Sequence, residues 1–237
     1  MISAIIFDVD GTLAETEDQH RLAFNAAFEQ AGLDWHWDEA LYRELLQVTG
    51  GKERLMHFIA TRAPLPQAEA DALVGRLHAA KTALYTEAVR AGAIPLRPGI
   101  TEFVEAAAAA GLTLAIATTT SLPNITTLLE SAFGARWRAL FAVIAAGDMV
   151  AHKKPSPDVY QLALDKLDLP AAACVAIEDS SNGVASARAA GLRVIAVRSL
   201  YTSGDDLSAA TLVLADCQNL DLALLAELDR AGLPRTA

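Results

Sequence analysis

Two aspartates stand directly after an apolar run near the start of the chain. The stretch AIIFDVDGT places Asp8 and Asp10 one residue apart, after residues typical of a buried β-strand, and a Gly-Thr turn follows them. An ionised carboxylate that leaves water is unfavourable unless a cation or hydrogen bonds compensate it. Packing alone gives no reason for the pair, so the spacing indicates that a cation binds here and that the carboxylates take part in chemistry.

Polar residues also follow three later apolar runs, at residues 112–117, 143–147 and 174–177. In open parallel sheets, ligands bind at the carboxyl ends of the strands. We therefore expect hydroxyl groups, a lysine and a second acid pair to converge with the two aspartates on one edge of a sheet. These residues are Thr118, Thr119, Thr120, Ser121, Lys154, Glu178 and Asp179.

The elements that must position these residues alternate between short apolar strands and helices. Helices are expected between most of the strands, at residues 101–110, 122–133, 157–167 and 182–190. Short, continuously apolar strands that alternate with helices are typical of parallel β-α-β units buried on both faces. The sequence therefore predicts an α/β fold with a doubly wound, mostly parallel, Rossmann-like sheet. Its strands are expected at residues 4–9, 112–117, 143–145, 174–177, 194–197 and 212–214.

One part of the chain breaks this alternation. Between residues 16 and 92 only helical patterns occur, at residues 17–31, 38–46, 53–61 and 67–89. We interpret residues 16–92 as an all-helical cap domain inserted after the first strand, and residues 1–15 and 93–237 as the α/β catalytic core. Residues 14–16 and 94–98 would be the linkers. The alternative, in which these helices pack directly on the sheet, stays open.

Composition and charge limit the partners and the compartment. The 237-residue chain carries a net charge of −10, has 53% hydrophobic residues, and has no apolar stretch near the ~20 residues that span a bilayer. Nucleic acids and anionic membranes are bound by basic faces, so neither is expected as a partner. The apolar run that begins the chain meets Asp8 too soon for a signal peptide, and the two cysteines show no metal or disulfide spacing. We expect a cytoplasmic monomer.

Four motifs stand in order along the chain: DVDGT (8–12), ATTTS (117–121), KKPSPD (153–158) and EDSSNG (178–183). In residue type and order they resemble the haloacid dehalogenase superfamily, and specifically its phosphatase and phosphomutase branch, over essentially the whole chain. The helical insertion lies where this family places a mobile cap. The resemblance implies Mg²⁺-dependent phosphoryl chemistry through an aspartyl-phosphate.

The same resemblance implies a role for each core residue. Asp8 is the nucleophile that attacks phosphorus, as carboxylates do in other covalent mechanisms. Asp10 is the general acid that protonates the leaving oxygen and then the base that activates water. Thr118 and Lys154 hold and neutralise the transferring phosphoryl group. Lys153 is interpreted as a solvated lysine.

Magnesium is the cation that this set of carboxylates favours. Mg²⁺ prefers hard oxygen ligands and often binds through one or two carboxylates together with a substrate phosphate. We expect Asp8, Asp179 and the backbone carbonyl of Asp10 as ligands. Glu178 is included in the metal set through a water or by orienting a neighbouring ligand.

The helical insertion contains a candidate substrate-binding turn, TGGKER at residues 49–54. Two glycines let backbone amides approach a ligand closely, and the lysine and arginine beside them add positive charge. With RPG (97–99) and ATTTSLPN (117–124), this turn resembles the CbbY-type sugar-bisphosphate phosphatases. That resemblance implies removal of the C1 phosphate of xylulose-1,5-bisphosphate, an inhibitor of the carboxylase of the Calvin cycle. The substrate-binding candidates are Glu17, Gly50, Gly51, Lys52, Arg54, Lys81, Arg97, Thr119, Thr120 and Ser121.

Other functions fit the sequence less well. A phosphomutase of the β-phosphoglucomutase kind shares all four motifs, although the Gly-Gly-Lys cluster argues against it. Haloacid dehalogenases and phosphonate hydrolases lack the second aspartate, here Asp10. A catalytically silent binding protein is expected to lose the nucleophile or a metal ligand, and this sequence retains both.

Overall fold

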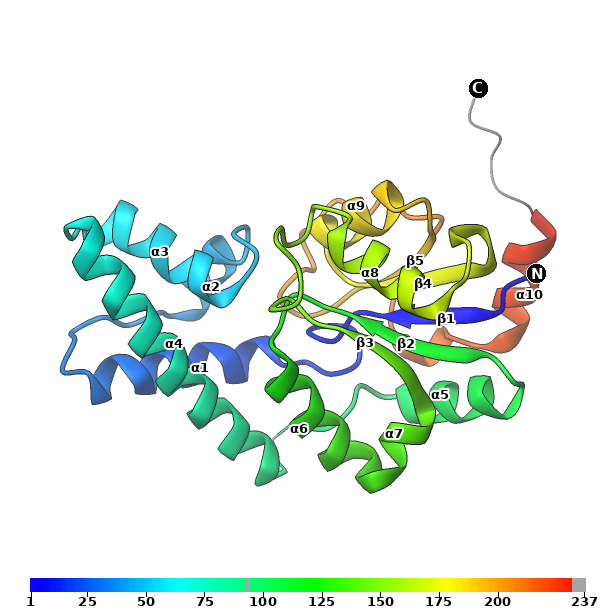
Figure 1. The fold of residues 1–237 in the computed structure, drawn as a ribbon, viewed down its shortest axis with the longest axis horizontal. Helices are drawn as coiled ribbons and strands as arrows, with labels where there is room; N and C mark the ends of the chain where they lie inside the picture. The colour runs from blue at the N-terminus through cyan, green and yellow to red at the C-terminus, as the bar shows by residue number, and fades with distance from the viewer. Residues whose placement is uncertain (93, 232–237) are drawn as a thin grey trace.

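A parallel sheet runs through the centre of the α/β part of the protein (Figure 1). The structure is a computed structural model that describes residues 1–92 and 94–231. Within these residues the sheet has six strands in the order β3-β2-β1-β4-β5-β6, and every neighbouring pair is parallel. The strands are β1 (Ala4–Phe7), β2 (Thr113–Ala117), β3 (Phe141–Ala145), β4 (Cys174–Glu178), β5 (Arg193–Val197) and β6 (Leu212–Leu214).

The strand order places β1 in the middle of the sheet. It pairs with β2 on one side and with β4 on the other. The chain runs outward from β1 to β3 and then returns to β4 before it continues to β6. Ligands of such sheets bind outside the carboxyl ends of the strands at this reversal, so the polar residues after β1, β2 and β4 share one edge. The predicted doubly wound parallel fold is confirmed.

Helices cover both faces of the sheet. The side chains of α5 (Ile100–Ala109), α6 (Leu122–Phe133) and α10 (Leu222–Ala231) pack in one hydrophobic cluster with Ile5 and Phe7 of β1. On the opposite face, α8 (Asp158–Leu167) and α9 (Ser181–Ala189) pack with Ile6. Burial on both faces explains why the strands are continuously apolar. The sequence analysis did not predict α7 (Trp137–Leu140) or α10. The described elements also include three short 3₁₀ helices: η1 (Gly134–Arg136), η2 (Ala171–Ala173) and η3 (Cys217–Asn219).

The expected helical insertion lies between β1 and α5, at the left of Figure 1. Its helices form a hydrophobic cluster separate from the two at the sheet, in which the rings of Phe24, Phe28 and Phe58 pack around that of Trp37. We refer to this group as the aromatic cluster. The helices of the insertion are α1 (Glu17–Gln30), α2 (Glu39–Leu45), α3 (Gly51–Arg62) and α4 (Gln67–Arg90).

The two predicted linkers lie side by side. Ala14 forms an isolated antiparallel bridge with Leu96, and the Arg97 amide donates to the Leu13 carbonyl at 2.8 Å. The insertion is also packed against the α/β part, because Tyr85 and Val89 of α4 belong to the same hydrophobic cluster as α6. The boundary predicted at residue 93 lies outside the described residues, and the division into two domains stays a prediction. No described helix has both the length and the apolar character needed to cross a membrane.

Candidate active site

A buried lysine joins the acid motifs at the end of the sheet. Lys154 Nζ donates to Asp8 Oδ1 and to Glu178 Oε1, both at 2.6 Å, and to the Ala117 carbonyl at 3.0 Å. Its three partners stand at or just after the ends of β1, β4 and β2. The convergence predicted from the strand ends is therefore present for these residues.

Burial dominates the electrostatics of this lysine cluster. It raises the pKa of Asp8 from 3.8 to about 7, although the positive charge of Lys154 lowers it. Burial alone would lower the pKa of Lys154, but the carboxylates of Asp8 and Glu178 raise it above its ordinary value. Burial, followed by the charge of Asp8, also raises the pKa of Asp179 well above its ordinary value. One lysine faces three buried acids, so the cluster favours a further cation.

The three acids offer a set of oxygen ligands. One carboxylate oxygen each from Asp8, Glu178 and Asp179 lies within 4.8 Å of the others, and all three residues are buried. Both oxygens of Glu178 are already hydrogen-bonded: Oε1 accepts from Lys154 and from the Tyr160 hydroxyl at 2.5 Å, and Oε2 accepts from the Asp179 amide at 3.3 Å. An all-carboxylate set fits Mg²⁺. Because both oxygens of Glu178 are already hydrogen-bonded, the geometry favours an orienting function for Glu178 and direct ligation by Asp8 and Asp179.

Asp179 is held by two hydroxyl groups that the sequence analysis missed. Ser199 Oγ and Thr202 Oγ1 donate to Asp179 Oδ2 at 2.7 and 2.9 Å. Both residues follow the carboxyl end of β5. The expectation that polar residues after the strands form the site would therefore have found them, had it been applied to this strand. Gly11 passes so close that an added Cβ would lie 2.1 Å from the same oxygen, and its φ of +79° also favours glycine. The glycine of the first motif is therefore required by the position of Asp179.

Asp10 is anchored by the start of α1. Its Oδ1 accepts from the Thr16 hydroxyl at 2.5 Å and lies 3.2 Å from His20 Nε2. His20 Nδ1 in turn lies 2.7 Å from Lys81 Nζ, and the His20 ring stacks on Tyr85 at 4.0 Å. Burial would raise the pKa of Asp10, but His20 and Thr16 lower it to about 2. Burial lowers the pKa of Lys81 to about 8.

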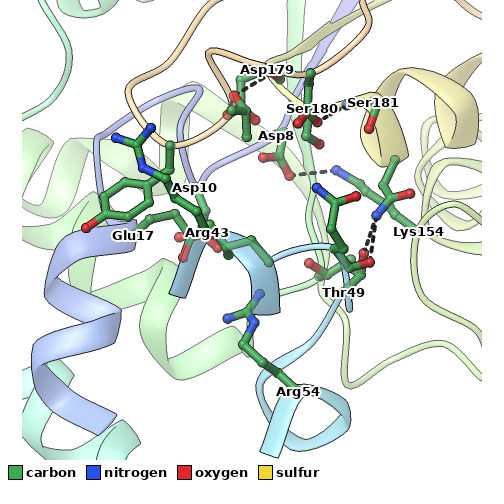
Figure 2. Close-up of a pocket in the computed structure, with 17 residues that line it drawn as sticks. Asp8, Asp10, Glu17, Arg43, Thr49, Arg54, Lys154, Asp179, Ser180 and Ser181 are labelled. Carbon is green, nitrogen blue, oxygen red and sulfur yellow. Dashed lines mark hydrogen bonds and ion pairs between the residues drawn. The ribbon is translucent and has the colours of Figure 1, made fainter. Parts of the chain in front are cut away.

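Two adjoining cavities open from these residues. The smaller one, of about 80 Å³, is lined by Asp8, Lys154 and Asp179, which face one another in Figure 2. The larger one, of about 780 Å³, lies between the insertion and the loops after β2 and β3. Sites for small molecules usually occupy ~300–1,000 Å³, so only the larger cavity has room for a sugar. Both are lined by Asp10, Glu17, Arg54 and Thr119.

Most of the expected substrate-binding residues line the larger cavity. It contains Gly50, Gly51, Lys52, Lys81, Thr120 and Ser121, in addition to the residues shared with the smaller one. Arg54 Nη1 donates to the Tyr42 hydroxyl at 3.0 Å, and this hydroxyl donates to Glu17 Oε2 at 2.8 Å. The helix predicted to start at residue 53 begins at Gly51, so the Gly-Gly turn forms the start of α3, where the first amides have no intrahelical partner. The sequence analysis missed Tyr42, and also His78 in the larger cavity.

Two predicted residues have other places. Arg97 donates to the carbonyls of Gly11 and Arg198 and forms an ion pair with Glu15 at 3.3 Å. Arg97 fixes the turn at Gly11, because its guanidinium donates to these carbonyls. It is absent from both cavity walls in the described structure. Thr118 is likewise absent from the described walls. Its hydroxyl accepts from the Thr120 amide at 3.3 Å.

Lys153 is also placed differently from the prediction of a solvated lysine. Its Nζ forms an ion pair with Glu53 of α3 at 2.8 Å. The loop that carries Lys154 is therefore connected directly to the helical insertion.

The model of the haloacid dehalogenase-like hydrolase family matches residues 2–191. This chain belongs to that family. The hydrolase is 54% identical over 209 residues to the protein CbbY of Rhodobacter capsulatus, covering 88% of this chain and 91% of the relative. It is 49% identical over 215 residues to the plasmid-encoded CbbY of Cupriavidus necator, covering 90% of this chain and 85% of the relative.

Solved structures of a CbbY protein also match this chain. CbbY from Rhodobacter sphaeroides in complex with phosphate matches with a TM-score of 0.88 and 49% identity, covering 95% of the hydrolase and 100% of that chain. A variant of that protein in complex with xylulose-1,5-bisphosphate matches with a TM-score of 0.87 and 49% identity, covering 94% and 98%. The predicted CbbY-type resemblance is confirmed. A β-phosphoglucomutase from Clostridium difficile matches with a TM-score of 0.76 at 20% identity, which shows a shared fold.

Replacing Lys154 of the hydrolase by methionine tests the ion cluster. In metal-free buffer near pH 7, Lys154→Met should lower the unfolding free energy by about 3–5 kcal/mol, because buried carboxylates lose their partner. Since the Asp8 pKa is raised in the folded state, protonated Asp8 favours folding at low pH, and this contribution is lost as the pH rises through about 7. The loss caused by the substitution should therefore shrink from pH 7 toward pH 5.

The measurement is urea unfolding followed by circular dichroism. Lys166→Met, at an exposed lysine of α8, is the matched control and should stay within about 0.5 kcal/mol of the parent. A Lys154→Met protein as stable as this control near pH 7 would contradict the ion cluster.

Proposed function

We propose that this hydrolase removes the C1 phosphate of xylulose-1,5-bisphosphate and releases xylulose 5-phosphate and inorganic phosphate. The observation that carries the proposal is the pair of adjoining cavities. A small one holds the buried acids and Lys154, and a larger one is bordered by Lys52 and Lys81. A bisphosphate needs one site for the reacting phosphate and another for the second one. The relative solved with xylulose-1,5-bisphosphate supports this choice of substrate.

Asp8 is the proposed nucleophile. Lys154 donates to Asp8 Oδ1. One oxygen of the Asp8 carboxylate attacks phosphorus, which breaks the phosphate–sugar bond and forms an aspartyl-phosphate. The ammonium group of Lys154 neutralises the transferring group. The Thr118 hydroxyl accepts from the Thr120 amide and still has a proton that it can donate to the phosphoryl group. We propose the hydroxyl of Thr119, which borders both cavities, as a second donor to this group.

Asp10 is the proposed general acid and base. Its pKa, lowered to about 2 by His20 and Thr16, favours the ionised form. The ionised form accepts a proton from the water that attacks the aspartyl-phosphate. The first step needs the protonated form, which the approach of a dianionic phosphate favours because a nearby like charge raises a carboxyl pKa. Thr16 and His20 fix the orientation in both steps.

Mg²⁺ is the proposed metal ion. The side chains of Asp8 and Asp179 and the backbone carbonyl of Asp10 would hold it, and Glu178 would orient them. When bound, the cation supplies positive charge between the attacking carboxylate and the phosphate. Ser199 and Thr202 keep the Asp179 carboxylate in place for this function.

The larger cavity is proposed to bind the second phosphate and the sugar. Lys52, Arg54 and Lys81 supply positive charge in a protein whose net charge is −10. Glu17, fixed by Tyr42, would accept hydrogen bonds from sugar hydroxyls.

Water attack on the aspartyl-phosphate distinguishes this reaction from a phosphomutase, and the close relatives favour the phosphatase. We further propose that the protein acts as a cytoplasmic monomer without nucleic-acid or membrane partners.

Asp8→Asn tests the chemistry. The variant should keep its circular dichroism spectrum and its affinity for xylulose-1,5-bisphosphate but release no phosphate above background, because an amide is a far poorer nucleophile. Phosphate release with Mg²⁺ is the assay. The parent should release one inorganic phosphate per xylulose 5-phosphate. Substantial turnover by folded Asp8→Asn, or return of labelled phosphate to another sugar hydroxyl in the parent, would refute the proposal.

Lys52→Ala tests the specificity of the larger cavity. It should lower kcat/KM for xylulose-1,5-bisphosphate by roughly 10- to 150-fold, the range for a lost charge-assisted hydrogen bond. Slow hydrolysis of p-nitrophenyl phosphate, which carries no second phosphate, should fall far less.

Arg62→Ala, on the exposed side of the same helix α3, is the matched control and should leave both substrates unaffected. Equal losses on both substrates would place Lys52 in the shared chemistry or in folding. No loss on either would remove it from the binding site.

A further inference from the structure

Tyr201 belongs to the core by sequence but packs in the helical insertion. It lies in the loop that follows β5, and its side chain belongs to the same hydrophobic cluster as residues of α1–α4. Its ring meets the Tyr42 ring edge-on at 5.8 Å, and the Arg43 guanidinium lies over it at 5.3 Å. Its hydroxyl donates to Asp18 Oδ1 at 2.6 Å. One side chain of the α/β part thus contacts both α1 and α2.

The ring beneath Tyr201 orients two residues of the proposed substrate site. Tyr42 donates to Glu17 Oε2 at 2.8 Å and accepts from Arg54 Nη1 at 3.0 Å. The Arg54 guanidinium also lies 5.1 Å from the centre of the Tyr42 ring. Glu17 and Arg54 border both cavities. A displacement of the Tyr42 ring would therefore move both of them.

The chain beside Tyr201 is fixed to the catalytic edge. Ser199 and Thr202, two positions before and one after it, donate to Asp179 Oδ2. The loop is thus attached to the acid cluster by its hydroxyls and to the insertion by its tyrosine. Tyr85 and Val89 of α4 and the contact of His20 with Asp10 are further buried connections between the two parts. The ion pair of Lys153 and Glu53 is more exposed, because its side chains are 21% and 47% exposed. Exposed ion pairs contribute little, so the buried tyrosine is a stronger connection than this ion pair.

We propose that Tyr201 is a positioning residue for the sugar-bisphosphate reaction. It holds the helical insertion against the α/β core and, through Tyr42, sets Glu17 and Arg54 opposite the acid cluster. This inference rests on the proposed function for its kinetic readout, while the packing itself can be measured independently. Tyr201 acts on the substrate only through other residues, so it should affect the parts of the reaction that depend on the insertion.

The kinetic test compares two substrates. Tyr201→Ala should lower kcat/KM for xylulose-1,5-bisphosphate by about 10- to 100-fold, mostly through KM, since an aromatic contact and a hydrogen bond are lost together. The loss on p-nitrophenyl phosphate should be at least tenfold smaller. Tyr201→Phe keeps the ring and should restore most of the loss, leaving a decrease of about 2- to 10-fold.

Leu200→Ala is the matched control, because this neighbour in the same loop is 60% exposed. It should change neither substrate by more than about twofold. Equal losses on both substrates in Tyr201→Ala, or no loss on the bisphosphate, would overturn the proposal.

A second measurement does not depend on activity. Small-angle X-ray scattering of the protein without substrate should give a larger radius of gyration for Tyr201→Ala than for the parent and for Leu200→Ala. An unchanged radius would overturn the docking function. Failure of the parent to hydrolyse xylulose-1,5-bisphosphate would instead refute the proposed substrate, and scattering would still decide the function of Tyr201.

Discussion

The structure depends on one electrostatic constraint: three carboxylates are buried at the end of a parallel sheet beside a single lysine. Asp8, Glu178 and Asp179 lie within reach of one another, and Lys154 hydrogen-bonds to the first two. Such a cluster is unstable in an apolar interior unless charge and hydrogen bonds compensate it. The lysine, the hydroxyls around Asp179 and a divalent cation are the groups that can do so. Without a further cation, the excess negative charge would repel a phosphate from this site.

The fold brings these groups together by topology. The central position of β1 puts its carboxyl end between those of β2 and β4, and helices on both faces keep water from the strands. A sheet alone would leave its edge open to solvent. The helical insertion covers this edge, and its side chains form the wall of the larger cavity opposite the loops of the core. The core therefore contributes the buried acids and Lys154, and the insertion contributes the opposite wall of the larger cavity.

The sequence was sufficient for features that follow from local rules. Apolar runs predicted the sheet, and their ends predicted the meeting of Asp8 and Lys154. Features that depend on long-range contacts escaped it. Arg97 is charged and near a linker, but its binding of two carbonyls depends on where the turn at Gly11 folds. Which of Thr118 and Thr119 borders the cavities depends on the backbone of the loop rather than on residue type, and Tyr201 finds its partners only after the insertion has packed.

Binding of Mg²⁺ to the metal-free protein tests the central claim most directly. Isothermal titration calorimetry near pH 7 should show one Mg²⁺ per chain for the parent and no measurable binding for Asp179→Ala, because a hard oxygen ligand is lost. Thr61→Ala, at an exposed position of α3, should bind as the parent does. Absence of Mg²⁺ binding by the parent, or equal affinity in Asp179→Ala, would contradict the account.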